Sequence, residues 1–239
     1  MYRLGNAPIR QFPFPHFYVE EIFAPELFAR LRNHLPPIEA YKPIAEGGKV
    51  FSTGGSTQDI YPERHIIHFR PDYFERMQAE DRVVWEALAK WLLGPNFLRF
   101  LLHRFEELLI QRFGDSLGSI EFQSSAQLLR DFTNYSLGPH ADHPSKVIVL
   151  LFYLPETDAS KHLGTSVYMA HNPEAHDDTG FHFNREDFYR AATMPFKPNC
   201  ALGFFKTPTS FHGVEHVAGE TEQRDLIQFA ISHTDRTKS

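Results

Sequence analysis

The spacing of apolar residues predicts three helices in the first half of the chain. The first covers residues 25–35, beginning at Pro25 and ending before a Pro-Pro pair. A second is expected from residue 72 or 81 to residue 93, where a Gly-Pro pair breaks it. A third is expected over residues 97–113, because apolar residues keep a helical spacing there until a glycine closes the segment.

After Gly118 the pattern changes to short apolar runs, separated by Gly, Pro, Asn and Asp. Such runs are typical of β-strands. The expected strands cover residues 121–132, 147–154, 165–170, 200–205, 213–217 and 226–232.

This succession of short strands favours a sandwich or a barrel. The run 147–154 is apolar at alternate and intervening positions alike, which predicts a central strand buried on both faces. The connection 155–198 is too long for a tight turn and is a candidate lid or substrate loop. We see no internal repeat and no flexible linker, so residues 1–239 are expected to form a single domain, with 1–118 a mainly helical support region.

The net charge of −6 and the isoelectric point near 6.1 give no overall field that would attract nucleic acid or an anionic membrane, and neither partner is expected. The N-terminus lacks the continuous apolar segment of a secretory signal. The longest strongly apolar run is far shorter than the roughly 18 residues needed to cross a bilayer. A single cysteine, Cys200, excludes an internal disulfide framework, and a cytoplasmic location is expected.

Candidate metal ligands lie in the stretch NYSLGPHADHP. His140 and Asp142 are two residues apart before a predicted strand, so both side chains can reach one metal. The chain contains two other His-x-Asp triplets, but one lies in a polar loop and the other is followed by no histidine. A second histidine ligand is available in His212, at the start of another predicted strand. His143 and His216 are its near-neighbour rivals.

Arg224 opens the last predicted strand, RDLIQFAIS. A buried arginine there would offer a planar fork for a carboxylate. Two histidines and a carboxylate on one face of a metal leave the opposite positions open, as in mononuclear iron sites. The ordered set of His140, Asp142, His212 and Arg224 is therefore far more specific than any one of its members.

With these residues the second half resembles the 2-oxoglutarate and Fe(II)-dependent oxygenases, whose catalytic core is a double-stranded β-helix, or jelly roll. HGVEHVAGETEQRDLIQF is similar to that family's His-x-Val-x-x-Val followed by Gly and Arg, and HLGTSVY to its Gly-Gly-x-Leu strand. FYLP resembles the Tyr-Leu-Asn strand of the prolyl-hydroxylase branch, and FYVEEIFAPELFARLRNHL its opening helix. The implied fold is an α+β jelly-roll core over residues 119–235, with the N-terminal helices packed against it.

The resemblance implies roles for individual residues. His140, Asp142 and His212 correspond to the Fe(II) ligands, and Arg224 to the residue that holds the distal carboxylate of 2-oxoglutarate. Tyr153 corresponds to a second hydrogen bond to that carboxylate, although a tyrosine in an apolar strand can equally be part of the core.

The chain also departs from the family pattern. Leu226 stands where many members have a serine that binds the co-substrate, and Arg130 stands where the prolyl-hydroxylase branch often has tyrosine, so prolyl hydroxylation is not implied. Asp142 favours hydroxylation over halogenation, since related halogenases have a small residue there. Arg130, Asn134 and Tyr135 are candidate substrate contacts. Five further histidines are expected in solvated loops or at the surface: His65, His68, His171, His176 and His182.

The expected function is an oxygenase that uses Fe(II), 2-oxoglutarate and O2 to hydroxylate an unactivated C–H bond of a small molecule or peptide, with release of succinate and CO2. Two alternatives remain open. A zinc hydrolase on a jelly roll could use the same ligands, and a non-catalytic jelly-roll module could bind the metal without turnover. The sequence does not indicate the oligomeric state.

Overall fold

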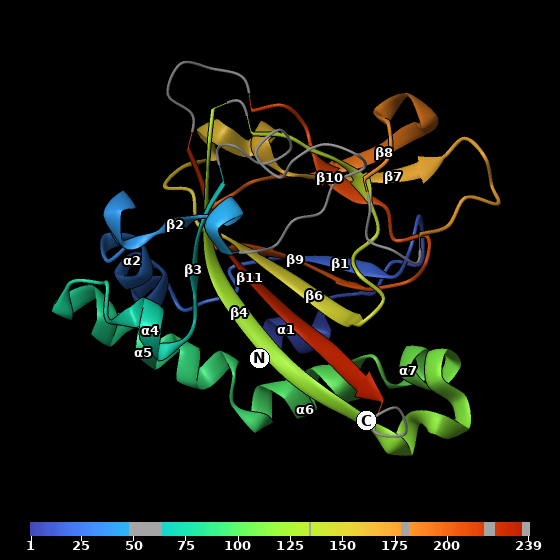
Figure 1. The fold of residues 1–239 in the computed structure, drawn as a ribbon, viewed down its shortest axis with the longest axis horizontal. Coiled ribbons are helices and arrows are strands. Elements are labelled where there is room, and N and C mark those ends of the chain that lie inside the picture. Colours follow the sequence, from blue (N-terminus) through green and yellow to red (C-terminus); the bar gives the residue numbers. More distant parts are fainter. Residues whose placement is uncertain (48–63, 134, 178–181, 218–222, 236–239) are drawn as a thin grey trace.

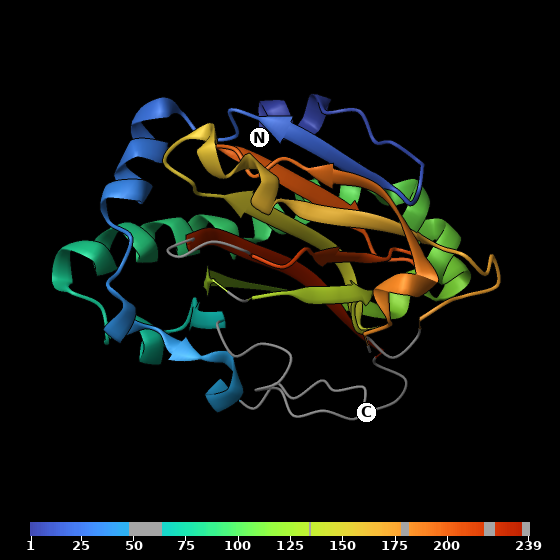
Figure 2. The ribbon, with the colours of Figure 1, turned by 90° about the horizontal axis from the view of Figure 1, so that it is seen from above.

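A computed structural model describes residues 1–47, 64–133, 135–177, 182–217 and 223–235. Within them, two antiparallel sheets face each other, and helices cover the outer face of the larger sheet (Figures 1 and 2). The larger sheet has the order β1 (His16–Glu20), β9 (Cys200–Phe205), β6 (Lys146–Tyr153), β11 (Gln223–Asp235), β4 (Ile120–Phe132), β3 (Arg64–His68) and β2 (Lys42–Pro43). The smaller sheet has the order β5 (Leu137–His140), β10 (His212–Val214), β7 (Thr165–Ala170) and β8 (Phe188–Met194).

The strands from β4 to β11 pass back and forth between the two sheets. Strands β4, β6, β9 and β11 lie in the larger sheet, and β5, β7, β8 and β10 lie in the smaller one. This is the arrangement of a jelly roll, in which two sheets of four core strands enclose an interior. The predicted fold class, an α+β jelly roll with helices packed against it, is confirmed.

The central strand β6 is buried on both faces, as its apolar run predicts. Its residues Val149 and Leu151 face the smaller sheet and pack in the jelly-roll interior. Ile148, Leu150 and Phe152 face the opposite way and pack against the helices. Alternate side chains of a strand point to opposite faces, so β6 separates two apolar cores.

The helical layer lies on the outer face of the larger sheet (Figure 2). Its main helices are α2 (Pro25–Asn33), α5 (Ala79–Leu92), α6 (Pro95–Arg104) and α7 (Glu106–Phe113), with the short α1 (Tyr2–Asn6) and α4 (Pro71–Phe74) beside them. The third predicted helix is in fact α6 followed by α7, because the backbone leaves the helical conformation at Phe105, where φ is −109° and ψ is 21°. None of the helices in the described part of the chain is long and apolar enough to cross a membrane.

The sequence prediction missed five strands, β1, β2, β3, β5 and β8. Three of these lie in residues 1–118, so the region expected to be mainly helical also extends the larger sheet. Strand β8 was missed because it is an edge strand whose middle residues are exposed. Its presence corrects the interpretation of 155–198 as one lid or substrate loop, since β7 and β8 make this segment half of the smaller sheet.

Candidate metal centre and its pocket

Two neighbouring strands of the smaller sheet bring the predicted metal ligands together. His140 ends β5 and His212 begins β10, where the two residues are paired across the antiparallel ladder. Their ring centroids lie 4.3 Å apart. Asp142 follows β5 directly, and one ligand atom from each of the three side chains lies within 4.8 Å of the others. All three residues are buried.

The hydrogen bonds of the two histidines determine which nitrogen faces the centre. Nδ1 of His140 lies 3.1 Å from the carbonyl oxygen of Gly138, and Nδ1 of His212 lies 3.0 Å from that of Ser210. A carbonyl oxygen only accepts hydrogen bonds, so Nδ1 carries the proton in each ring. Nε2 then keeps its lone pair for a metal, an arrangement common among metal-binding histidines.

The two carboxylate oxygens of Asp142 have different environments. Oδ1 accepts a hydrogen bond of 2.5 Å from Nζ of Lys146. Oδ2 is buried without a hydrogen-bond partner among the described residues and lies 3.7 Å from Nε2 of His212. A buried carboxylate oxygen without a partner is costly, and a divalent cation beside two Nε2 atoms would satisfy it. The donor set therefore fits Fe(II), which imidazole and carboxylate ligands suit.

The electrostatics keep all three side chains in their ligating forms. Burial lowers the pKa of His140 well below its ordinary value, and neighbouring His212 and His182 lower it further. Burial likewise lowers the pKa of His212. For Asp142 burial acts in the opposite direction, but Lys146, His212 and His140 outweigh it and hold the pKa below its usual range. Metal ligands must be deprotonated to bind, so this site is ready to do so at neutral pH.

Asp177 ties both ligand-bearing segments together, a role that sequence reasoning missed. Its Oδ2 accepts a hydrogen bond of 3.1 Å from the backbone N–H of Ala141, between His140 and Asp142. Its own N–H donates to the carbonyl of Pro208, in the segment that leads to His212. Asp177 is the middle residue of the His-Asp-Asp triplet at 176–178, which the sequence pattern assigned to a polar loop, yet Asp177 is only 2% exposed.

The two residues expected to bind a carboxylate meet at Thr165, which sequence reasoning did not single out. Tyr153 donates its hydroxyl hydrogen to Oγ1 of Thr165 at 2.9 Å, and Nη2 of Arg224 approaches the same atom at 3.2 Å. Nε of Arg224 donates to the carbonyl of Leu163 at 2.7 Å. Burial raises the pKa of Tyr153, so its hydroxyl stays a hydrogen-bond donor.

A buried row of charges runs across three strands of the larger sheet beside Thr165. Asp131 on β4 pairs with Arg64 on β3 and with Arg224 on β11 in the ladder. Arg64 makes two hydrogen bonds to this carboxylate, at 2.6 and 2.8 Å, and Nη1 of Arg224 donates to it at 2.8 Å. Arg224 therefore has a structural partner, and Asp131 holds its guanidinium in place. Arg64 lies on a strand that the sequence pattern did not reveal.

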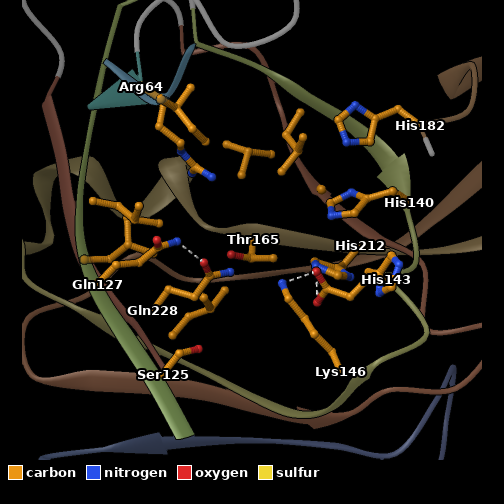
Figure 3. A pocket seen from close by; sticks show the side chains of 18 of the residues that line it. Arg64, Ser125, Gln127, His140, His143, Lys146, Thr165, His182, His212 and Gln228 are labelled. Atoms are coloured by element: carbon orange, nitrogen blue, oxygen red, sulfur yellow. Dashed lines mark hydrogen bonds and ion pairs between the residues drawn. The ribbon is translucent and has the colours of Figure 1, made fainter. Parts of the chain in front are cut away.

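The metal ligands and both arginines line one cavity of about 420 Å³. Figure 3 shows Arg64 on one side of this pocket and His140, His182 and His212 on the other. His182 was expected at the surface, but its ring centroid lies 4.8 Å from that of His140. Burial, followed by the charge of His212, lowers the pKa of His182 to about 4. His65 and His68 were also expected at the surface; they lie in strand β3 and are partly exposed.

Two of the predicted substrate contacts, Arg130 and Tyr135, do not line this pocket. Arg130 is not among the residues that line this pocket, because it points to the other face of β4, where it donates to Asp225 at 2.7 Å and to Pro36. Tyr135 is fully buried beneath Arg64, whose guanidinium carbon lies 4.4 Å from the centroid of the Tyr135 ring. Asn134 lies outside the described residues.

Comparison with solved structures identifies the fold. The chain is similar to the non-heme α-ketoglutarate-dependent carbocyclase SnoK of nogalamycin biosynthesis, with a TM-score of 0.53 and 11% sequence identity over 92% of this chain and 81% of that one. It is also similar to a Pseudomonas putida prolyl-4-hydroxylase, with a TM-score of 0.49 and 13% identity over 91% of each chain. No protein-family model and no curated protein sequence matches the chain. The likeness to SnoK shows a shared jelly-roll fold.

Proposed function

We propose that the protein is an Fe(II)- and 2-oxoglutarate-dependent oxygenase that hydroxylates an unactivated C–H bond of a small molecule or peptide. The observation that carries this proposal is the buried set of His140, Asp142 and His212, in which Oδ2 of Asp142 has no hydrogen-bond partner among the described residues. Fe(II) and 2-oxoglutarate, when bound, would supply the oxidation: O2 and the keto acid are converted to succinate and CO2, and one oxygen atom enters the substrate.

The protein's own residues would bind and orient these reactants. Nε2 of His140, Nε2 of His212 and Oδ2 of Asp142 would hold the metal from one side. Arg224 would bind the distal carboxylate of 2-oxoglutarate, with the hydroxyl groups of Tyr153 and Thr165 beside it. Asp131 keeps the Arg224 fork in position, so little side-chain entropy remains to be lost when the carboxylate binds.

The buried arginine cluster supports the oxygenase over a zinc hydrolase. Hydrolysis needs a metal and water but no separate dicarboxylate site, so in a hydrolase Arg224 would serve only its structural bonds to Asp131 and Leu163. The similarly folded SnoK is itself α-ketoglutarate-dependent, which adds support. A non-catalytic module would equally leave the combination of metal ligands and carboxylate site unused. The single buried, unbridged cysteine is consistent with the cytoplasm, which we propose as the location.

The test is formation of succinate from 2-oxoglutarate in the presence of Fe(II) and O2. The prime substrate is not needed, because slow uncoupled turnover also forms succinate. The parent protein should form succinate, and Asp142→Ala should form none. His143→Ala is the matched control, since His143 also lines the pocket but bonds Ser145 instead of joining the metal cluster. Equal succinate formation by the parent and the Asp142 variant would refute the ligand assignment.

A further inference from the structure

One wall of the pocket is polar where a jelly-roll interior is ordinarily apolar. Gln127 on β4 and Gln228 on β11 face each other in the ladder, and both line the pocket. Ser125 and Ser232 extend this wall along the same two strands. On the same inner face the next pair, Leu129 and Leu226, is buried and apolar. We call Ser125, Gln127, Gln228 and Ser232 the polar wall.

The two glutamines present complementary groups to a ligand. Nε2 of Gln127 donates to Oε1 of Gln228 at 2.5 Å. This bond uses one end of each amide, and no described side chain hydrogen-bonds to the other ends. The carbonyl oxygen of Gln127 and the amino group of Gln228 thus form an acceptor and a donor side by side. Such groups in a partly buried wall favour a hydrogen-bonding ligand over an apolar one.

Lys146 places a positive charge beside the polar wall. It is paired with Ser232 in the ladder between β6 and β11. Figure 3 shows its ammonium group pointing into the pocket, as the amide of Gln228 does. Its partner Asp142 is the only carboxylate among the described residues that line the pocket, whereas Arg64, Lys146 and Arg224 are cations.

The charges of the bound site can be counted from these groups. A divalent metal would be balanced by Asp142 and the metal-chelating carboxylate of 2-oxoglutarate. Arg64, Arg224 and the carboxylate of Asp131 together carry one positive charge, which the distal carboxylate of 2-oxoglutarate would balance. Among the described residues the site then carries one net positive charge, because Asp142 is shared between the metal and the ammonium group of Lys146, whose side chain is 25% exposed. An unbalanced buried charge is costly, so an anion is expected to bind beside it.

We propose that Lys146 and the polar wall bind the substrate, and that the substrate is a small polar molecule with one anionic group. The anion pairs with Lys146, and a neighbouring amide, amine or hydroxyl group meets Gln127 and Gln228. The cavity volume of about 420 Å³ suits a small molecule. This inference rests on the proposed oxygenase function and specifies the substrate class of the same site.

The experiment is an anaerobic titration of the Fe(II) and 2-oxoglutarate complex with named ligands. Binding is followed through changes in the visible absorption band that the chelated iron gives. The probes are the standard amino acids, their carboxamides, and the phosphate esters glycerol 3-phosphate and glucose 6-phosphate. Carboxylates and phosphates share the anionic chemistry, and the two arms distinguish them. At least one anionic probe should perturb the band, and its neutral analogue should bind at least about ten-fold more weakly, as for a lost charged hydrogen bond.

Three variants separate the roles. Gln228 lies in the polar wall and contacts no metal ligand. Gln228→Leu should therefore lower the affinity for the anionic probe about ten-fold and leave formation of the absorption band unchanged. Lys146→Gln should lower the affinity for the anionic probe further, and Lys146→Arg should retain part of that affinity. Lys161→Gln is the matched control, since Lys161 is exposed and away from the pocket.

The outcomes are distinct for the two proposals. No absorption band in the parent would refute the oxygenase function itself. A band that no anionic probe perturbs, neutral analogues that bind as well as the acids, or unchanged probe affinity in Gln228→Leu and Lys146→Gln would each overturn the substrate assignment while leaving the oxygenase function intact.

Discussion

His140 and His212 are paired across two antiparallel strands, with ring centroids 4.3 Å apart. The metal centre is therefore built into the backbone hydrogen bonding of the smaller sheet, although 72 residues separate the two histidines in the chain. Because sheet pairing fixes both backbones and a carbonyl oxygen fixes each Nδ1, the Nε2 atoms are oriented before any metal arrives. Preorganised ligands of this kind reduce the entropy lost on binding.

This arrangement predicts strong, selective loss of metal binding in ligand variants. His212→Ala should weaken Co(II) binding by at least about a hundred-fold, because one of three protein ligands is removed. The measurement is a titration followed by the Co(II) absorption spectrum. His143→Ala and His216→Ala should retain the parent affinity. A normal spectrum in His212→Ala, or its loss in either control, would show that a rival histidine is the ligand.

Asp177 should influence the metal without touching it. Asp177→Asn removes the charged acceptor for the N–H of Ala141, and loss of such supporting bonds typically weakens metal binding about 10- to 100-fold. We expect a change in the Co(II) spectrum as well as in affinity, which distinguishes altered ligand orientation from simple instability. Asp158→Asn, at an exposed position, is the control. Identical spectra for all three proteins would contradict the positioning role.

Arg224 should affect 2-oxoglutarate and not the metal. Arg224→Lys removes the planar fork while keeping the charge, and the dissociation constant for 2-oxoglutarate should rise about ten- to a hundred-fold. Tyr153→Phe should raise it only a few-fold, because Thr165 still supplies a hydroxyl group. Both variants should bind Co(II) like the parent. A parent-like 2-oxoglutarate affinity in Arg224→Lys would show that Arg224 serves the fold alone.

Asp131 should matter mainly for stability. It is fully buried and bonded to both Arg64 and Arg224. Asp131→Asn would remove the carboxylate that two buried guanidinium groups share, and we expect the free energy of unfolding to fall by about 3–5 kcal/mol. Chemical denaturation measures this loss. Asp72→Asn breaks a pair with Arg70 that is exposed on both sides and should leave stability unchanged.

The buried histidines predict how stability of the metal-free protein depends on pH. The pKa values of His140, His212 and His182 lie below the ordinary value of 6.5, that of His182 at about 4. At pH values between the lowered pKa of each native histidine and the ordinary value of 6.5, the unfolded chain binds more protons than the native one. The free energy of unfolding therefore falls as the pH drops below about 6.5. Each histidine contributes a slope of at most about 1.4 kcal/mol per pH unit. Denaturation at several pH values should show this fall, and His182→Gln should make it shallower. An unchanged slope would contradict the lowered pKa of His182.

The apolar runs allowed prediction of a sandwich or barrel, and the resemblance of the sequence motifs to a known family narrowed this to a jelly roll. The spacing and order of the polar residues singled out those that meet at the metal centre. The apolar runs of β6 and β11 mark buried strands, and His140 and His212 lie at strand ends. The sequence did not allow prediction of the place of Arg64 in the pocket, because the short strand β3 is distant in the chain from β4 and gives no sign that it pairs with it. Lys146, Asp177 and Gln228 were missed for the same reason: their contacts arise from packing between distant segments.

Tyr153 and Arg130 illustrate the two ways in which a family resemblance can apply to a chain. Tyr153 donates to Thr165, which Arg224 also approaches, and Thr165 and Arg224 line the pocket, whereas Tyr153 lies buried behind Thr165. Arg130 was matched by counting residues back from His140, but alternate residues of β4 face opposite sides, and the inward-facing positions are Leu129 and Asp131. Counting along the chain fails where the parity of a strand decides which way a side chain points.

Joint binding of Fe(II) and 2-oxoglutarate in this pocket is the core of the proposed function. The most direct measurement is anaerobic: Fe(II) is added to the metal-free protein, then 2-oxoglutarate, while the visible spectrum is recorded for a metal-to-ligand charge-transfer band. We expect the band to appear only when both are present and to disappear in Asp142→Ala. Bound metal without any band at saturating 2-oxoglutarate would show that the pocket does not bind 2-oxoglutarate at the metal and would favour a hydrolase or a binding module.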